Sequence, residues 1–147
     1  MTSPDKYIRA AYITALQSAT GLKVWHKKVP KNTSPVPAKY IILDSQTKNE
    51  TVKSKPSETG NSQTQFEWLC TIDVNIYSIN QSGISNAAVV DDIEEIVLSV
   101  VRGGVVTVTG FKIKNTAILE SMDLSVETAA QSTDRKLVKF EHWLSEG

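Results

Sequence analysis

Two stretches of the chain place apolar residues at helical spacing. The first follows Ser3-Pro4-Asp5, in which Ser3 fits an N-cap and Pro4 the first helical position, and Gly21 suits a left-handed C-terminal stop. The second ends at Arg102 and two glycines. We therefore predict amphipathic helices over about residues 4–19 and 86–102. Their apolar positions are Tyr7, Ile8, Ala11, Tyr12, Ala15 and Leu16 in the first and Val89, Val90, Ile93, Ile96, Val97 and Val100 in the second.

Apolar residues occupy every second position from Phe66 to Ile76, and polar residues stand between them at every position but Leu69, which predicts a long amphipathic strand. Shorter patterns predict strands at 24–26, 40–43, 105–113, 116–126 and 136–144. Three prolines between residues 30 and 37 remove backbone donors, so that segment is an extended connection and not a central strand. The polar turn at residues 129–134 predicts an antiparallel hairpin between its flanking segments.

The order helix, strands, helix, strands indicates an α+β fold. We expect a mostly antiparallel sheet of five or six strands with two helices packed on one face. A chain of 147 residues has the usual size of one domain, so we expect residues 1–147 to form a single α+β domain.

Residues 46–65 are rich in Thr, Ser, Lys, Asn, Gln and Glu and have no apolar pattern. A polar stretch of this length inside a compact domain is a functional loop, a disordered segment or the tip of a long hairpin. We expect a long flexible loop outside the core. The sequence leaves open whether it stays solvated or becomes ordered against a partner.

Sixteen basic residues balance sixteen acidic ones, which excludes the strong positive field that duplex-binding proteins use. We therefore expect protein partners and no sequence-specific nucleic acid. The single cysteine, Cys70, cannot form an internal disulfide, and no apolar run is long enough to cross a membrane. The first residues lack the pattern of a signal peptide, so we expect a protein of the reducing cytoplasm and no membrane partner.

The sequence carries no catalytic or metal-binding motif that we recognise. His26 and His142 lie far apart along the chain, and no Cys, Asp or Glu stands near them at a metal-ligand spacing. Cys70 shares the apolar face of its strand, where a buried, inert thiol is expected. No serine lies in a hydrolase turn, and Gly103-Gly104 precedes a strand, not a helix. We therefore predict no enzyme activity, no metal and no cofactor.

Charged residues outside the predicted core are the candidates for protein contacts. Consecutive acids on a helix diverge around it, so the acids of the second helix form a solvated face or dock a basic partner, and share no cation. The predicted contact residues are Lys48, Lys53 and Lys55 in the polar loop and Asp91, Asp92 and Glu95 on the second helix.

The layout of the chain resembles the tail terminator and tail-completion proteins, the head-tail joining proteins of long-tailed bacteriophages. The resemblance covers nearly the whole chain and rests on apolar patterns and turn residues. Its parts are the helix ending at Thr20-Gly21, Val29-Pro30, the run from Pro37 to Leu43, the polar loop, the strand from Cys70 to Tyr77, the helix from Val89 to Val101, and the hairpin through Asp134-Arg135 to Glu141.

The resemblance implies a virion protein at the head-tail junction that forms a ring, usually of six copies. Such a ring would cap the tail tube, join it to the head-completion or connector protein, and let genome DNA pass through. In the family the long loop commonly faces the ring lumen or the partner below, which places residues 46–65 there. The alternatives are another neck protein such as a stopper, a tail-tube subunit, and, from another class, a small ligand- or protein-binding α+β domain.

Overall fold

The structure is a computed structural model that describes residues 3–53, 65–81, 87–127 and 131–146. These residues form two helices and six strands, and each helix is followed along the chain by three strands. The helices are α1 (Asp5–Thr20) and α2 (Ala87–Arg102). The strands are β1 (Val24–His26), β2 (Lys39–Lys53), β3 (Gln65–Gln81), β4 (Phe111–Asp123), β5 (Val126–Glu127) and β6 (Gln131–Glu146).

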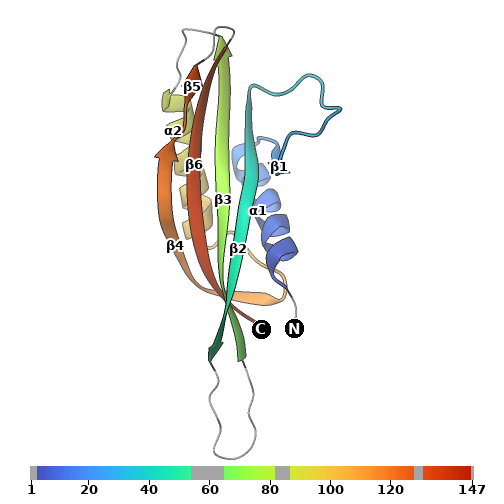
Figure 1. Cartoon of the computed structure of the whole chain (residues 1–147), viewed down its shortest axis with the longest axis vertical. Helices are drawn as coiled ribbons and strands as arrows, with labels where there is room; N and C mark the ends of the chain where they lie inside the picture. Colours follow the sequence, from blue (N-terminus) through green and yellow to red (C-terminus); the bar gives the residue numbers. More distant parts are fainter. Residues whose placement is uncertain (1–2, 54–64, 82–86, 128–130, 147) are drawn as a thin grey trace, which may run out of the picture.

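All six strands belong to one sheet in the order β1-β2-β3-β6-β4, and the short β5 pairs with β6. The pair β1 and β2 is parallel, and the other pairs are antiparallel. Strands β2, β3 and β6 contain 15, 17 and 16 residues. At about 3.3 Å per residue they are roughly 50 Å long, which gives the elongated shape of Figure 1.

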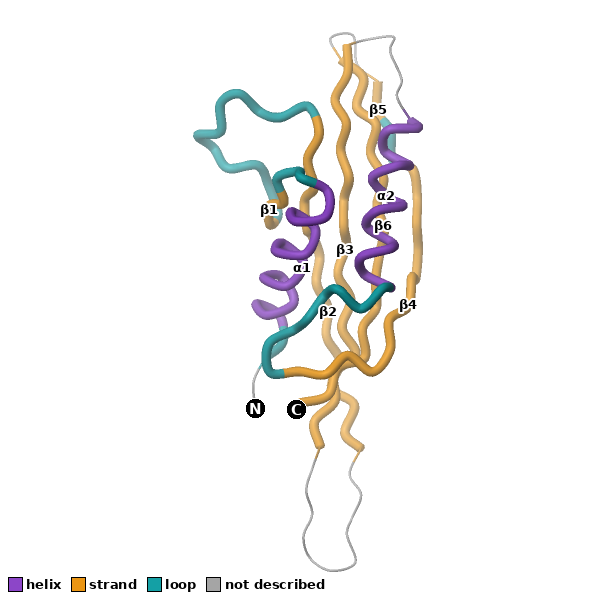
Figure 2. Tube along the Cα trace, turned by 180° about the vertical axis from the view of Figure 1, so that it is seen from behind, coloured by secondary structure: helices purple, strands orange, loops and turns teal. Residues whose placement is uncertain are grey.

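Both helices pack on the same face of this sheet, as seen from the front in Figure 1 and from behind in Figure 2. Tyr12 of α1 contacts the Phe140 ring of β6, and α2 turns its valine stripe to the same layer. The fold class predicted from the sequence is therefore confirmed. The largest fully buried apolar side chains are Tyr12, Phe140, Ile8, Leu16, Ile41, Leu43, Ile72, Ile76, Leu144 and Val74.

The ends of α1 follow from its local sequence. Gly21 adopts φ 71°, and its N–H donates to the Gln17 carbonyl at 3.0 Å, which ends the helix as predicted. The helix begins at Asp5, one residue later than expected, with Pro4 as the flanking residue. Ser3 does not cap it. The Ser3 hydroxyl instead accepts a hydrogen bond from Lys48 Nζ at 2.7 Å.

The sequence prediction placed two strands between residues 105 and 126 with the wrong bounds. The segments expected at 105–113 and 116–126 are one irregular connection and one strand, β4. Gly110, at φ 83°, turns the chain immediately before β4, and the Phe111 N–H donates to the Val108 carbonyl. Shifts of register near Lys114 and Leu119 disturb the alternation within β4, which made one strand look like two.

The C-terminal hairpin forms as predicted, because β4 and β6 pair antiparallel. Its turn was placed too late, since β6 already begins at Gln131.

The polar segment 46–65 was predicted to be a loop, and its first eight residues are instead strand. Strand β2 continues to Lys53 and pairs with β3 from Gln65 onward. This end of the hairpin extends past the helices in Figure 2, and residues 47–51 are exposed, so the strand needs no apolar face there. Residues 54–64 lie outside the described residues.

Candidate functional site

Lys48 lies on the helix-covered face of β2, where it is held by α1. Its Nζ forms an ion pair with Asp5 at 2.8 Å and lies 5.8 Å from the centre of the Trp68 ring. The side chain of Lys53 and the whole of Lys55 lie outside the described residues. The contacts of these three lysines with a partner stay predictions. Lys48 would have to break its ion pair with Asp5 to form such a contact.

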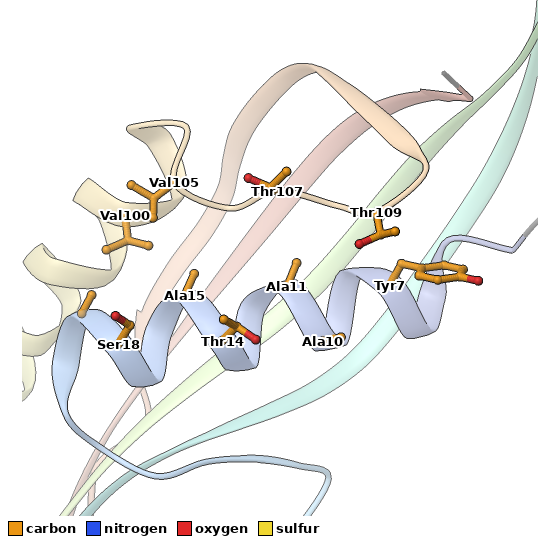
Figure 3. Close-up of a pocket in the computed structure, with 11 residues that line it drawn as sticks. Tyr7, Ala10, Ala11, Thr14, Ala15, Ser18, Val100, Val105, Thr107 and Thr109 are labelled. Atoms are coloured by element: carbon orange, nitrogen blue, oxygen red, sulfur yellow. The ribbon is translucent and has the colours of Figure 1, made fainter.

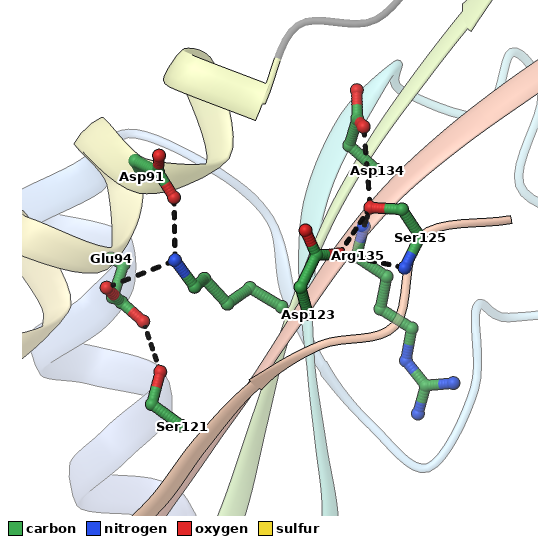
Figure 4. A network of polar contacts seen from close by, with 8 residues as sticks. Asp91, Glu94, Ser121, Asp123, Ser125, Asp134 and Arg135 are labelled. Atoms are coloured by element: carbon green, nitrogen blue, oxygen red, sulfur yellow. Dashed lines mark hydrogen bonds and ion pairs between the residues drawn. The ribbon is translucent and has the colours of Figure 1, made fainter.

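The acids predicted as contacts on α2 divide into two kinds. Asp91 pairs with Lys136 of β6 at 2.6 Å, and Glu94 pairs with the same ammonium at 3.5 Å. The Ser121 hydroxyl of β4 donates to Glu94 at 2.6 Å (Figure 4). The hydrogen bond to Asp91 raises the pKa of Lys136, so this ammonium stays charged at neutral pH and ties α2 to the sheet.

Asp92 and Glu95 are exposed on α2 and form no ion pair with any described residue. These two acids are therefore available to a partner, whereas Asp91 is already occupied. No ion pair joins the α2 acids to Lys48 in the described part of the chain, so the predicted contacts form two separate surfaces.

A groove of about 570 Å³ runs between α1 and the connection that follows α2. Its walls are small side chains of α1 opposite Val100, Val105 and two threonines (Figure 3). Tyr7 is the one lining residue with an ionisable side chain. The groove therefore offers shape and apolar contact, but neither a nucleophile with an adjacent base nor a set of metal ligands.

A polar cluster that the sequence did not predict is buried between α1 and the sheet. The Tyr12 hydroxyl hydrogen-bonds to His142 Nε2, and the Thr116 hydroxyl lies 3.0 Å from His142 Nδ1. Burial lowers the pKa of His142 to about 4 and raises that of Tyr12 well above its usual value, so both are neutral at pH 7. Since both residues are at most 1% exposed, this pair supports the core and cannot reach a substrate.

Cys70 is buried on the same face, as predicted from the alternation of β3. Burial, with a smaller contribution from the Asp5 carboxylate, raises the pKa of its thiol to about 12. The thiolate is the reactive form, so Cys70 is inert at neutral pH. Among the described residues, no group of three or more His, Cys, Asp or Glu side chains is placed to hold a metal ion.

The face of the sheet opposite the helices is uncovered in Figure 1 and carries an aromatic ladder at one end. The Tyr40 and Tyr77 rings stack with centroids 5.0 Å apart, and Trp25 lies 5.8 Å from Tyr40. The Arg135 guanidinium lies 5.4 Å from the Tyr77 ring and donates two hydrogen bonds to Asn75 Oδ1. These contacts fix side chains of four strands without any help from the helices.

A row of charged side chains crosses the middle of the uncovered face. Asp44 of β2 is in register with Asp73 of β3, Asp73 with Lys139 of β6, and Lys139 with Glu120 of β4. We call these four residues the acidic row. It holds three carboxylates and one ammonium, so its net charge is about −2 at neutral pH.

Asp73 is the least solvated carboxylate of the acidic row, with an exposed fraction of 8%. Its Oδ1 accepts no hydrogen bond from a described residue, and Lys139 Nζ is 3.9 Å away. Burial raises the pKa of Asp73, and the carboxylates of Asp44 and Glu120 raise it further, against the Lys139 ammonium. The alternation of β3 already predicted that Asp73 lies opposite the core, but no pattern along the chain indicated that Asp44 and Glu120 would lie in the same row.

No protein-family model matches the chain, and no curated protein sequence matches it. A solved structure does: a chain of the "Virion of native gene transfer agent (GTA) particle" superposes with a TM-score of 0.66. The superposition covers 99% of this chain and 99% of that chain, at 14% sequence identity. At this identity the likeness shows that the two chains share a fold. None of the described helices is long and apolar enough to span a membrane.

Proposed function

We propose that this protein is a structural virion protein of the phage head-tail junction, where a ring of its copies caps the tail tube and joins it to the head connector. The observation that carries the proposal is the likeness to a virion chain over 99% of both lengths. A match of this extent compares one whole chain with another whole chain and is not limited to a shared motif.

The chemistry of the described residues supports an assembly role. The groove beside α1 holds hydroxyl groups but no base adjacent to them, and the buried histidine is out of reach of solvent. The charged surfaces, by contrast, are extensive and lie on both sides of the sheet. Contacts between subunits are therefore better supported than catalysis. In the proposed assembly each copy contacts its neighbours head to tail, and a closing rotation gives a ring.

The resemblance of the sequence layout to tail terminators places this protein, in our proposal, at the end of the tail tube. The partners would be other copies of this chain, the tail-tube protein and the head-completion or connector protein. Genome DNA would pass through the ring without sequence-specific contacts, in keeping with the balanced charge of the chain.

The test is the mass and shape of the purified protein over a range of concentrations, by light scattering and negative-stain microscopy, followed by addition of tail-tube protein. We expect a closed ring that binds the ends of tubes and stops their growth. Lengthening of the tubes would identify a tube subunit instead. A one-to-one complex with a different protein, or tight binding of a small molecule by the monomer, would contradict the proposal.

A further inference from the structure

The connection between β1 and β2 extends away from the sheet edge in Figures 1 and 2. Residues 27–38, which we call the lysine loop, contain Lys27, Lys28 and Lys31 and no acidic residue. All three lysines are exposed, and none forms an ion pair with a described residue. The lysine loop is therefore a projecting segment of charge about +3 with no acidic residue of its own.

The acidic row has the opposite imbalance. Asp73 is 8% exposed, lacks a hydrogen bond on Oδ1 and lies between Asp44 and Lys139 in the row. The Lys139 ammonium, 3.9 Å away, is the one positive charge for the three carboxylates of the acidic row, so the row is only partly compensated within one chain. Asp44 and Glu120 form no ion pair with a described residue. An ammonium from outside would offset this charge in a site that is already partly desolvated.

The uncovered face also offers apolar surface next to the acidic row. The neighbouring row across the strands is Ile42, Asn75, Leu137 and Met122, of which Leu137 and Met122 are half-buried. The lysine loop carries Val36, with an exposed fraction of 49%, among its prolines. An apolar centre with charged groups around it is the usual composition of a protein interface.

We propose that the lysine loop of one copy docks on the acidic row of the next copy, as a head-to-tail contact between subunits. This inference rests on the proposed function, because it names the contact that would close the ring. The two surfaces are different parts of the chain, so each copy offers both, and the contact repeats from subunit to subunit. Duplex DNA is the other ligand that a projecting lysine segment could bind, but DNA would leave the acidic row uncompensated.

The test uses two charge-reversed variants of the full chain. In the loop variant, Lys28→Glu and Lys31→Glu leave Lys27 as the remaining lysine, so the charge of the lysine loop changes from about +3 to about −1. In the face variant, Asp44→Lys and Glu120→Lys change the charge of the acidic row from about −2 to about +2. Asp73 is left unchanged because it is buried. For each variant alone, the protein concentration at which half of the chains are assembled should rise at least about ten-fold, since like charges then face each other.

An equimolar mixture of the two variants distinguishes this contact from any other. The acidic loop of the loop variant then meets the basic row of the face variant. At the next contact the unchanged lysine loop of the face variant meets the unchanged acidic row of the loop variant. We expect assembly to return in the mixture, with the two variants alternating, which a ring with an even number of copies permits. The matched control for the loop variant is Lys6→Glu with Arg102→Glu, which changes the net charge by the same amount and sign on exposed helical positions. This control should assemble as the unaltered chain does.

The outcomes separate the two proposals. If both single variants form rings as readily as the unaltered chain, the contact is wrong while the ring stands. If both are impaired and the mixture stays impaired, the lysine loop and the acidic row do not meet, and the contact is again wrong. If the loop variant loses affinity for a duplex DNA fragment and assembles normally, the lysine loop binds nucleic acid. If the unaltered chain forms no ring and caps no tube, the proposed function fails together with the contact.

Discussion

At the scale of single residues, His142 has a hydrogen-bond partner on each ring nitrogen, since it lies between Tyr12 and Thr116 in the core. A neutral imidazole has one donor and one acceptor nitrogen, so it satisfies both hydroxyl partners at once. Protonation would leave a charge in the core with no carboxylate among these hydrogen-bond partners. The consequence is a dependence of stability on pH.

We predict that the free energy of unfolding falls as the pH is lowered from about 6.5 toward 4. The pKa of His142 is lowered from 6.5 to about 4 in the folded chain, so the unfolded chain binds more protons in this window. The contribution is complete above pH 6.5 and is lost through the window, by an amount on the order of 3 kcal/mol at its full extent. The measurement is urea unfolding at a series of pH values for the unaltered chain and for His142→Gln.

The variant separates this effect from the carboxylates, which titrate in both proteins. We expect a steeper dependence between pH 6 and 4.5 in the unaltered chain than in His142→Gln. The same point can be checked directly by NMR on the folded protein. An imidazole resonance of His142 that titrates near pH 6.5 would contradict the prediction.

A second prediction at this scale concerns the α2 acids. Asp92→Lys with Glu95→Lys should weaken assembly and leave the free energy of unfolding nearly unchanged, because neither acid has an internal ion pair with a described residue. Asp91→Lys should instead lower stability by up to about 1 kcal/mol, the usual limit for a surface pair. Light scattering and urea unfolding on the same samples test both statements, and an unchanged yield of assembly in the double variant would remove these acids from the interface.

At the scale of elements, the stop signal of α1 is the feature that the sequence predicted most directly. Gly21 has φ 71°, and nothing lies within 4 Å of where a Cβ would stand, so a larger side chain meets backbone strain and no clash. We predict that Gly21→Ala lowers the free energy of unfolding by about 1 kcal/mol. Thermal or urea unfolding measures it, with Gly21→Asn as the control that should lose less, because asparagine tolerates this conformation better. Equal losses in the two variants would show that conformational strain is not the cause.

Strand boundaries were harder to predict than helix ends, for a physical reason that differs between strands. In β2 the residues from 45 to 51 are polar, since Gln46 and Lys48 form hydrogen bonds and an ion pair with α1 and the positions from 49 to 51 are exposed, and pairing with β3 makes them strand. In β4 two register shifts break the alternation. In the connection before β4, Val106 and Val108 are buried without being paired in the sheet. Alternation indicates burial on one side, and that is not the same property as pairing.

At the scale of the whole molecule, the net charge is zero, whereas the lysine loop and the acidic row carry opposite charges. The lysine loop projects from the β1 and β2 edge, and the acidic row crosses the face opposite the helices. A head-to-tail contact between them would be electrostatic in large part. The ring should then be sensitive to salt.

We predict that raising the salt concentration from about 0.1 M to 1 M increases the protein concentration needed for half-assembly, since the screening length falls from about 10 Å to about 3 Å. Light scattering over a dilution series at each salt concentration gives the value. The loop variant should show a weaker salt dependence than the unaltered chain, because its attractive contact is already lost. Assembly that strengthens with salt would indicate an interface dominated by apolar contact instead.

The sequence by itself determined the two helices, the stop at Gly21, the long strand β3, the burial of Cys70 and the α+β class, because each follows from the spacing of neighbouring residues along the chain. Tertiary structure alone decided which side chains meet across strands and layers. Asp44, Asp73 and Glu120 come from three strands, and Tyr12 and His142 are 130 residues apart. Their registers are set by the packing of the whole sheet against its helices, which no local pattern encodes.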